Sequence, residues 1–163
     1  MKTINLTQGK VALVDDEDYG YLNKWKWHVH KVGNIYYAVR NVYKPKQRKI
    51  HMHRVILNAT DGVEVDHINS NGLDNQKLNL RLCTRSENMR NQRLSCRNTI
   101  GFKGVFFDKG RISKPCCAQI RLNNKNIHLG RYHTLKEAAQ AYDRAALRYH
   151  KEFALTNKML GLL

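Results

Sequence analysis

Two adjacent side chains, Asp66 and His67, could carry out proton transfer and metal binding. Histidine is the side chain whose ordinary pKa lies near neutrality, so it can take up a proton at physiological pH. A carboxylate such as that of Asp66 is a ligand for a hard divalent cation. The pair ends an alternating apolar segment, 63–67, which favours a strand. Taken alone, such a pair is more often an incidental surface pair than a base beside a ligand, so its interpretation depends on the flanking sequence.

The net charge predicts a polyanionic partner. The 163 residues include 29 Lys and Arg against 13 Asp and Glu, a formal net charge of +16, and such an excess repels itself unless a partner neutralises it. Nine Lys and Arg occur between Asp18 and Asp61 with no acid among them, and seven occur between Asp108 and Glu137. Two basic surfaces that grip a duplex at two places fit this distribution. A membrane-surface protein would need a basic amphipathic helix, and none stands out.

The composition also limits which cellular location and which structural metals or disulfides are expected. Without a long apolar run or a signal-like N-terminus, the chain is expected to be soluble and cytoplasmic, with no membrane partner. The four cysteines form no CxxC pair, which argues against structural zinc. Thiols in a cytoplasm stay reduced, so a disulfide framework is not expected either. These cysteines are Cys83, Cys96, Cys116 and Cys117.

Periodicity and turn residues predict the elements that position Asp66 and His67. Strands are expected at 10–14, 36–43, 49–57, 63–68 and 78–82, with an acidic turn at 15–18 and a basic loop at 44–48. Thr84 with Glu87 three residues later is a capping box, which predicts that a helix begins there. Four aromatic residues alternate with polar ones and are expected in the core: Trp25, Trp27, Tyr36 and Tyr37. The order around the pair is strand, loop, strand, helix.

The second half of the chain predicts a separate small domain. Residues 91–98 lack an apolar period, which indicates a linker. Short strands are expected at 104–108, 116–122 and 126–132. A capping box of Thr134 and Glu137 then starts a helix whose apolar residues recur at helical spacing. We therefore expect an α+β protein divided into residues 1–92, a linker 93–98, a domain 99–157 and a tail 158–163.

Several segments around Asp66 and His67 together resemble one family. They are Val65-Asp66-His67-Ile68, Asn79-Leu80-Arg81 and Thr84-Arg85-Ser86-Glu87-Asn88, preceded by His53-Arg54. In this order, with Asp66 and Asn88 22 positions apart, they resemble the HNH endonucleases of the phage homing type. The resemblance implies the ββα-metal (His-Me finger) fold, with its core at about residues 50–92 and extra strands before it.

The resemblance also implies a mechanism. His67 would be the general base that activates water, and Asp66 and Asn88 would bind one divalent metal ion through oxygen. That ion would be Mg²⁺, with Mn²⁺ able to substitute. Asn79 corresponds to the middle Asn of the motif, and its amide would bond the loop backbone and help to orient the base. Asn88 stands where the motif name has its last His, which favours an oxygen-binding metal over zinc.

Three further residues are candidates for phosphate contacts: His53, Arg54 and Arg81. His51 and His53 are expected on one face of the strand at 49–57. Either could bind metal, touch phosphate or simply pack.

Residues 99–157 resemble a second family, the apetala-two/ethylene-response-factor DNA-binding domain, which also occurs fused to phage HNH nucleases. The matching segments include Gly104-Val105, Ala118-Gln119-Ile120-Arg121, Ile127–Tyr132, Glu137–Ala146, Phe153-Ala154 and Asn157. The implied fold is a three-stranded antiparallel sheet packed on one helix, with the exposed sheet face entering the major groove. By position, five residues are expected to face DNA: Lys103, Arg121, Lys125, His128 and Arg131. Phe106, Phe107 and Cys116 replace residues usual in plant members, so plant target sequences do not transfer.

The sequence therefore predicts an enzyme that nicks or cuts double-stranded DNA at a preferred site, in the cytoplasm of a bacterial or phage-infected cell. One active site per chain would let a monomer nick and a homodimer cut both strands. Two alternatives stay open. A non-catalytic DNA-binding regulator predicts tight, salt-sensitive binding without cleavage, and an RNA-directed module predicts a preference for structured RNA.

Overall fold

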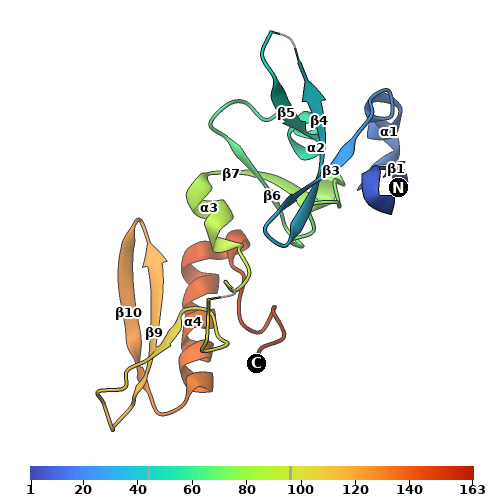
Figure 1. Ribbon diagram of the computed structural model, residues 1–163. Coiled ribbons are helices and arrows are strands. Elements are labelled where there is room, and N and C mark those ends of the chain that lie inside the picture. The colour runs from blue at the N-terminus through green and yellow to red at the C-terminus, as the bar shows by residue number, and fades with distance from the viewer. Residues whose placement is uncertain (44, 96) are drawn as a thin grey trace. The chain divides into compact units, whose positions relative to one another are not determined.

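The computed structural model describes residues 1–43, 45–95 and 97–163. Lys44, in the expected basic loop, and Cys96, in the expected linker, lie outside the described residues. The chain divides into two compact units, Met1–Asn88 and Met89–Leu163, which we describe one at a time. The architecture mixes small antiparallel sheets with short helices, as expected (Figure 1). None of the described helices is both long enough and apolar enough to span a membrane.

The N-terminal unit is built from three small antiparallel sheets, with strand orders β1-β2, β3-β4-β5 and β6-β7. Its elements are β1 (Lys2–Asn5), β2 (Val11–Val14), α1 (Asp16–Leu22), β3 (His28–Val32), β4 (Ile35–Val42), β5 (Arg48–His51), α2 (Met52–Ile56), β6 (Glu64–His67), β7 (Leu80–Cys83) and α3 (Arg85–Arg90). The last helix runs past the boundary between the units.

The core of this unit lies between the first strands, α1 and α2. Val14, Leu22 and Met52 are completely buried there. Trp27 is buried as expected, and its indole N–H donates to the Leu22 carbonyl at 2.9 Å. Trp25, by contrast, is 46% exposed, so its predicted place in the core is wrong. The alternation of aromatic and polar residues cannot say which aromatic lies at the edge of the sheet.

Two other expectations for this unit need correction. Residues 49–57 do not form one strand, because β5 ends at His51 and α2 begins at Met52. The change from strand to helix at Met52 buries that side chain in the core. It also lets Arg54 make the hydrogen bonds described below. The acidic segment 15–18 is the start of α1, where three carboxylates in the first turn interact favourably with the helix dipole.

The C-terminal unit packs one helix against a three-stranded antiparallel sheet of order β10-β9-β8 (Figure 1). The elements are β8 (Val105–Phe107), β9 (Cys116–Leu122), β10 (Lys125–Tyr132) and α4 (Leu135–His150). Asn123 and Asn124 both have positive φ and form the tight turn between β9 and β10. The capping box of Thr134 and Glu137 is formed at the start of α4.

Small side chains let α4 lie close to this sheet. Ala138, Ala139 and Ala146 are buried against β9. Gly104 precedes β8 with φ +71°, and a Cβ there would lie only 1.9 Å from Cδ2 of Tyr142 on α4. Glycine is therefore required at position 104 by both the backbone conformation and the contact.

Candidate active site

The side chains of the predicted site come from β6, from β7 and Asn79 just before it, and from α3. β6 pairs with β7 in a register that sets Asp66 opposite Arg81 and His67 opposite Leu80. Asp66 and His67 are 5% and 6% exposed, so neither is the surface pair that the dipeptide alone would suggest. The strand therefore delivers a carboxylate and an imidazole to the interior of the unit.

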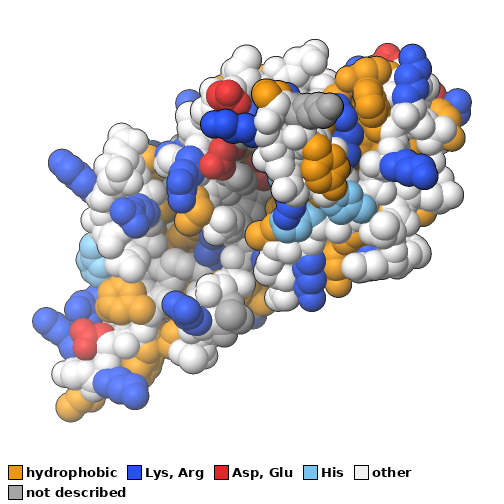
Figure 2. All heavy atoms as spheres, turned by 45° about the horizontal axis from the view of Figure 1, so that its top comes forward, with side chains coloured by type: hydrophobic (Ala, Val, Ile, Leu, Met, Phe, Trp, Pro, Cys, Tyr) orange, Lys and Arg blue, Asp and Glu red, His pale blue; other side chains and the backbone are white. Residues whose placement is uncertain are grey.

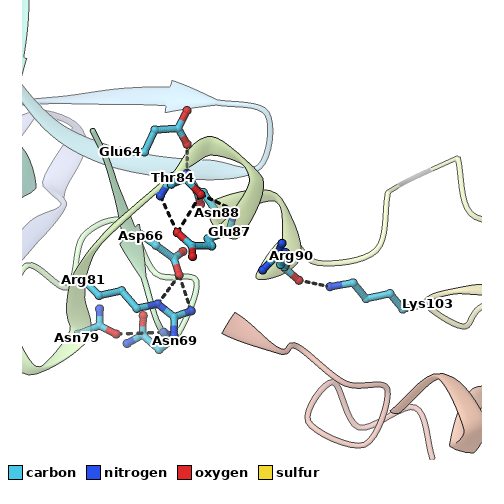
Figure 3. A network of polar contacts seen from close by, with 10 residues as sticks. All are labelled: Glu64, Asp66, Asn69, Asn79, Arg81, Thr84, Glu87, Asn88, Arg90 and Lys103. Carbon is cyan, nitrogen blue, oxygen red and sulfur yellow. Dashed lines mark hydrogen bonds and ion pairs between the residues drawn. The ribbon is translucent and has the colours of Figure 1, made fainter. Parts of the chain in front are cut away.

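Asp66 is held by an ion pair with Arg81 (Figure 3). Nε and Nη2 of Arg81 donate to Asp66 Oδ2 at 2.8 and 2.6 Å. Because both side chains are largely buried, water screens this pair little. Arg81, expected to contact phosphate, is thus placed beside the expected metal ligand.

Asn88 reaches the same region from α3. Its Nδ2 donates to Oε2 of Glu64 at 2.7 Å, and Figure 3 shows the two side chains joined near Asp66. We did not single out Glu64 from the sequence. The available signal was its position two residues before Asp66, which places both carboxylates on one face of β6.

A capping box fixes where α3 begins and so where Asn88 lies. The backbone N–H of Thr84 donates to Glu87 Oε2 at 2.8 Å, and the Glu87 N–H donates back to Thr84 Oγ1 at 3.3 Å. The Asn88 N–H then donates to the Thr84 carbonyl at 3.0 Å. Asn88 therefore projects from the first turn of a helix whose start is set by local sequence.

Burial keeps His67 neutral. Desolvation lowers its pKa from the ordinary value, while a hydrogen bond with the Asn75 side chain and the negative charges of Asp66 and Asp74 oppose that shift. A neutral imidazole has a nitrogen lone pair, and it can accept a proton. The protonation state is the one that a general base requires.

The loop after His67 is tied to Asn79. Asn79 Oδ1 accepts from the backbone N–H of Asn69 at 3.0 Å, and its Nδ2 donates to the Asp74 carbonyl at 2.8 Å. The Ile68 N–H donates to the Asn79 carbonyl at 2.9 Å. The turn-rich segment begins two residues after His67, and Asn79 thus bonds to both of its ends.

His51 and His53 do not share a strand face, because the strand ends between them, yet their rings lie close to the site. The centroid of the His53 ring is 4.9 Å from that of His67 and 5.1 Å from that of His51. Tyr37 contacts all three rings at 5.7 to 5.9 Å, a role that its expected place in the core did not suggest. Burial, with the neighbouring His67, lowers the pKa of His53 to about 2. Figure 2 shows His side chains gathered beside hydrophobic and cationic ones.

Arg54, a candidate for a phosphate contact, is bonded to three carbonyls within the chain. Its Nη1 donates to the Val63 carbonyl at 2.6 Å, and its Nη2 donates to the carbonyls of Ala59 and Thr60 at 3.2 and 2.9 Å. A guanidinium that bonds three carbonyls of one loop has few donors left for a ligand. Arg54 therefore stabilises the loop that leads into β6.

The oxygen donors of the site suit a hard cation. Across residues 1–43, 45–95 and 97–163, no group of three or more His, Cys, Asp or Glu is arranged to hold a metal ion. Asp66 and Asn88 are a smaller set of one carboxylate and one amide. Since Nδ2 of Asn88 already bonds to Glu64, its oxygen is the atom that points elsewhere. Such a pair fits an ion that keeps several waters, as Mg²⁺ does.

In the C-terminal unit, three expected DNA-facing residues share the sheet face opposite α4. Cys116, Ala118 and Ile120 of β9 pack toward the helix, so Arg121 points away from it. His128 pairs with Gln119, and Arg131 pairs with Cys117, which places both on the face of Arg121. In a regular strand, residues three apart lie on opposite faces. A β-bulge between His128 and Gly130 shifts the register, so His128 and Arg131 lie on the same face.

The other two residues lie elsewhere. Lys125 is exposed at the hairpin end but pairs with Leu122, on the helix side of the sheet. Lys103 does not face outward: its Nζ donates to the carbonyls of Arg90 and Gln92 at 2.6 and 2.8 Å. Burial lowers the pKa of Lys103 to about 8. The ammonium of Lys103, which we expected to face DNA, thus bonds to the end of α3 and to the chain just after it.

Comparison with known proteins bears on this site directly. Residues 51–90 match the HNH endonuclease family, and this segment runs from His51 through α3. This part of the chain is therefore similar to an HNH endonuclease domain. The chain is also 27% identical over 154 residues to an uncharacterized HNH endonuclease of Acanthamoeba polyphaga mimivirus, covering 93% of the present chain and 77% of the relative. No solved structure matches the chain. The family match and the named relative support a nuclease, with DNA as the substrate that the family implies.

Proposed function

We propose that this HNH nuclease hydrolyses DNA phosphodiester bonds with one divalent metal ion, using His67 as general base and Asp66 and Asn88 as the protein ligands. The observation that supports this most is that Asp66 and His67 are buried at the end of β6, while Asn88 of α3 bonds to Glu64 of the same strand near Asp66 (Figure 3). Bound there, the metal ion, which we propose to be Mg²⁺, would act as a Lewis acid that neutralises charge on the phosphate.

The residues of the chain divide the remaining work. Neutral His67 takes a proton from the attacking water as the water oxygen bonds to phosphorus and the bond to the leaving oxygen breaks. Asn79 holds the loop that follows His67 and so limits the movement of the base. The pair with Arg81 orients the Asp66 carboxylate. In this arrangement β6, β7 and α3 act as the ββα-metal core.

Cleavage of supercoiled plasmid that carries a preferred site, in the presence of Mg²⁺, tests the proposal. Loss of a general base typically costs about 100-fold or more in rate, so His67→Ala should be slower by at least that factor. The exposed His133 offers a matched control, because His133→Ala removes an imidazole outside the site. Equal cleavage by wild type and His67→Ala would contradict the assignment. Tight binding without cleavage by the wild type would favour the regulator.

We further propose that the sheet face of Arg121, His128 and Arg131 reads duplex DNA. These side chains lie on adjacent strands, and a two-stranded ribbon fits the major groove. Arg131 is held in place by an ion pair with Asp108 at 2.9 Å. Arg121→Gln should reduce the preference for the selected site over random duplex by about 1–3 kcal/mol. Lys136→Gln, an exposed position on α4, should leave that preference unchanged.

A further inference from the structure

A second basic surface lies in the N-terminal unit, on a different part of its structure from the active site. It is a groove of about 500 Å³ beside β4 and β5. The residues of the groove that carry its chemistry are Trp25, Lys26, Arg40, Tyr43 and Arg48. We call this surface the Trp25 groove.

The register of the sheet separates the Trp25 groove from the catalytic histidines. Arg40 pairs with Ile50, and Arg48 pairs with Val42, so these four side chains share one face of the sheet. His51 pairs with Val39 one position along, which places it on the other face, toward His53 and His67. A ligand in the groove would therefore not occupy the proposed active site.

Two exposed aromatic rings border the groove. Trp25 is 46% exposed and Tyr43 is 68% exposed. The guanidinium of Arg40 lies 4.2 Å from the centroid of the Trp25 ring, and a cation over an indole face is a favourable arrangement. Large aromatic side chains left in water beside a cation form a surface on which a planar group can stack.

The groove also has a polar atom that lacks a partner among the described residues. Nε of Arg40 is buried and makes no hydrogen bond to any of them. Unpaired buried polar atoms are costly and uncommon, so this one calls for an explanation. The lining residues of the groove also include three cations and no acid.

We propose that the Trp25 groove binds an unpaired nucleotide of the DNA strand. Exposed aromatic rings give bases a stacking surface, and the cations contact the phosphate. A duplex keeps its bases stacked inside and would use the cations but not the rings. An acidic peptide would also need the cations alone. The proposal goes beyond cleavage by the HNH site and reading by the C-terminal sheet.

Intrinsic fluorescence can test this without a label. The chain has two tryptophans, Trp25 and Trp27, both in the N-terminal unit, so DNA binding to the C-terminal unit does not touch either one directly. A short oligothymidylate is added to the full chain without metal. We expect it to quench the emission of the wild type and of Trp27→Phe, in which Trp25 is the remaining emitter. We expect Trp25→Phe to show no quenching, because Trp27 is 5% exposed.

Affinity measured by anisotropy of the labelled oligonucleotide provides a second readout. Stacking on an aromatic residue contributes enough that Tyr43→Ala should weaken binding at least about five-fold. The matched control is Tyr21→Ala, which removes a similarly exposed ring on α1 outside the groove. Arg48→Gln should also weaken binding and reduce its dependence on salt.

Three outcomes would overturn the proposal. One is equal quenching in Trp25→Phe and the wild type. Another is a duplex or a polyglutamate peptide that quenches Trp25 at concentrations as low as the oligothymidylate. The third is an equal effect of Tyr43→Ala and Tyr21→Ala. Since plasmid cleavage by the HNH site is measured separately, failure here leaves the proposed function standing.

Discussion

The ion pair between Asp66 and Arg81 makes the sharpest prediction about stability. Arg81→Met keeps much of the length of the side chain but removes the guanidinium, which donates twice to Asp66 Oδ2 at 2.8 and 2.6 Å. The two side chains are 6% and 15% exposed, so Asp66 stays buried when its cation is removed. Breaking a buried pair in this way costs about 3–5 kcal/mol, and we expect the N-terminal unit to lose stability by that amount.

A divalent cation should restore part of that loss. Asp66 and Asn88 are the proposed ligands, and the charge of the ion would take the place of the lost guanidinium. Binding at about 100 times the dissociation constant adds roughly 2.7 kcal/mol to the free energy of unfolding. The gain on adding Mg²⁺ should therefore be larger in Arg81→Met than in Asp66→Asn/Arg81→Met, which lacks the carboxylate.

Urea unfolding followed by tryptophan fluorescence measures these changes in the N-terminal unit alone, since both tryptophans lie there. Lys77→Met is the matched control. It removes a cation that bridges Glu17 and Asp18 at an exposed position, and exposed pairs contribute little. If Arg81→Met unfolds at the same urea concentration as the wild type, the buried-pair reasoning fails. If Mg²⁺ stabilises the single and the double variant equally, Asp66 is not a metal ligand.

Two more predictions concern the C-terminal unit. Gly104→Ala combines a positive φ with a Cβ 1.9 Å from the Tyr142 ring, so the free energy of unfolding should fall by about 2–4 kcal/mol. Gly101→Ala is the control, because position 101 also has a positive φ but no neighbour within 4 Å. It should lose only the cost of the backbone conformation, about 1–2 kcal/mol. Equal losses in the two variants would argue against the contact with Tyr142. The pKa of Lys103 is lowered from 10.5 to about 8, so between these values the unfolded chain binds the extra proton and stability should rise with pH, by about 3 kcal/mol at most. Chemical unfolding at several pH values, compared with Lys103→Met, isolates this rise, and parallel pH profiles would contradict it.

Local sequence signals predicted the framework of the site well. Both capping boxes, Thr84 with Glu87 and Thr134 with Glu137, form at the starts of α3 and α4. The strands that became β6 and β7 were indicated by their alternation. These signals work because a cap or a strand period depends on residues within a few positions of one another.

The contacts that sequence reasoning did not foresee are those with partners further along the chain. Arg54 bonds carbonyls of a loop that begins five residues later, and Lys103 bonds carbonyls 11 and 13 residues away. In a sequence both look like free cations suited to phosphate. Glu64 was missed for the same reason, because its partner Asn88 lies 24 positions further along.

The sequence by itself determined which chemistry is available: the residue types at 66, 67, 79 and 88 resemble the HNH motif, and residues 51–90 match that family. It also determined the starts of α3 and α4 and most strands. Tertiary structure alone decided which charges are buried, which cations are bonded within the chain, and which side of each sheet a side chain occupies. The physical reason is that burial and pairing depend on segments far apart in the sequence. The protonation state of His67 and the exposure of Trp25 are therefore properties of the fold, although both residues are visible in the chain.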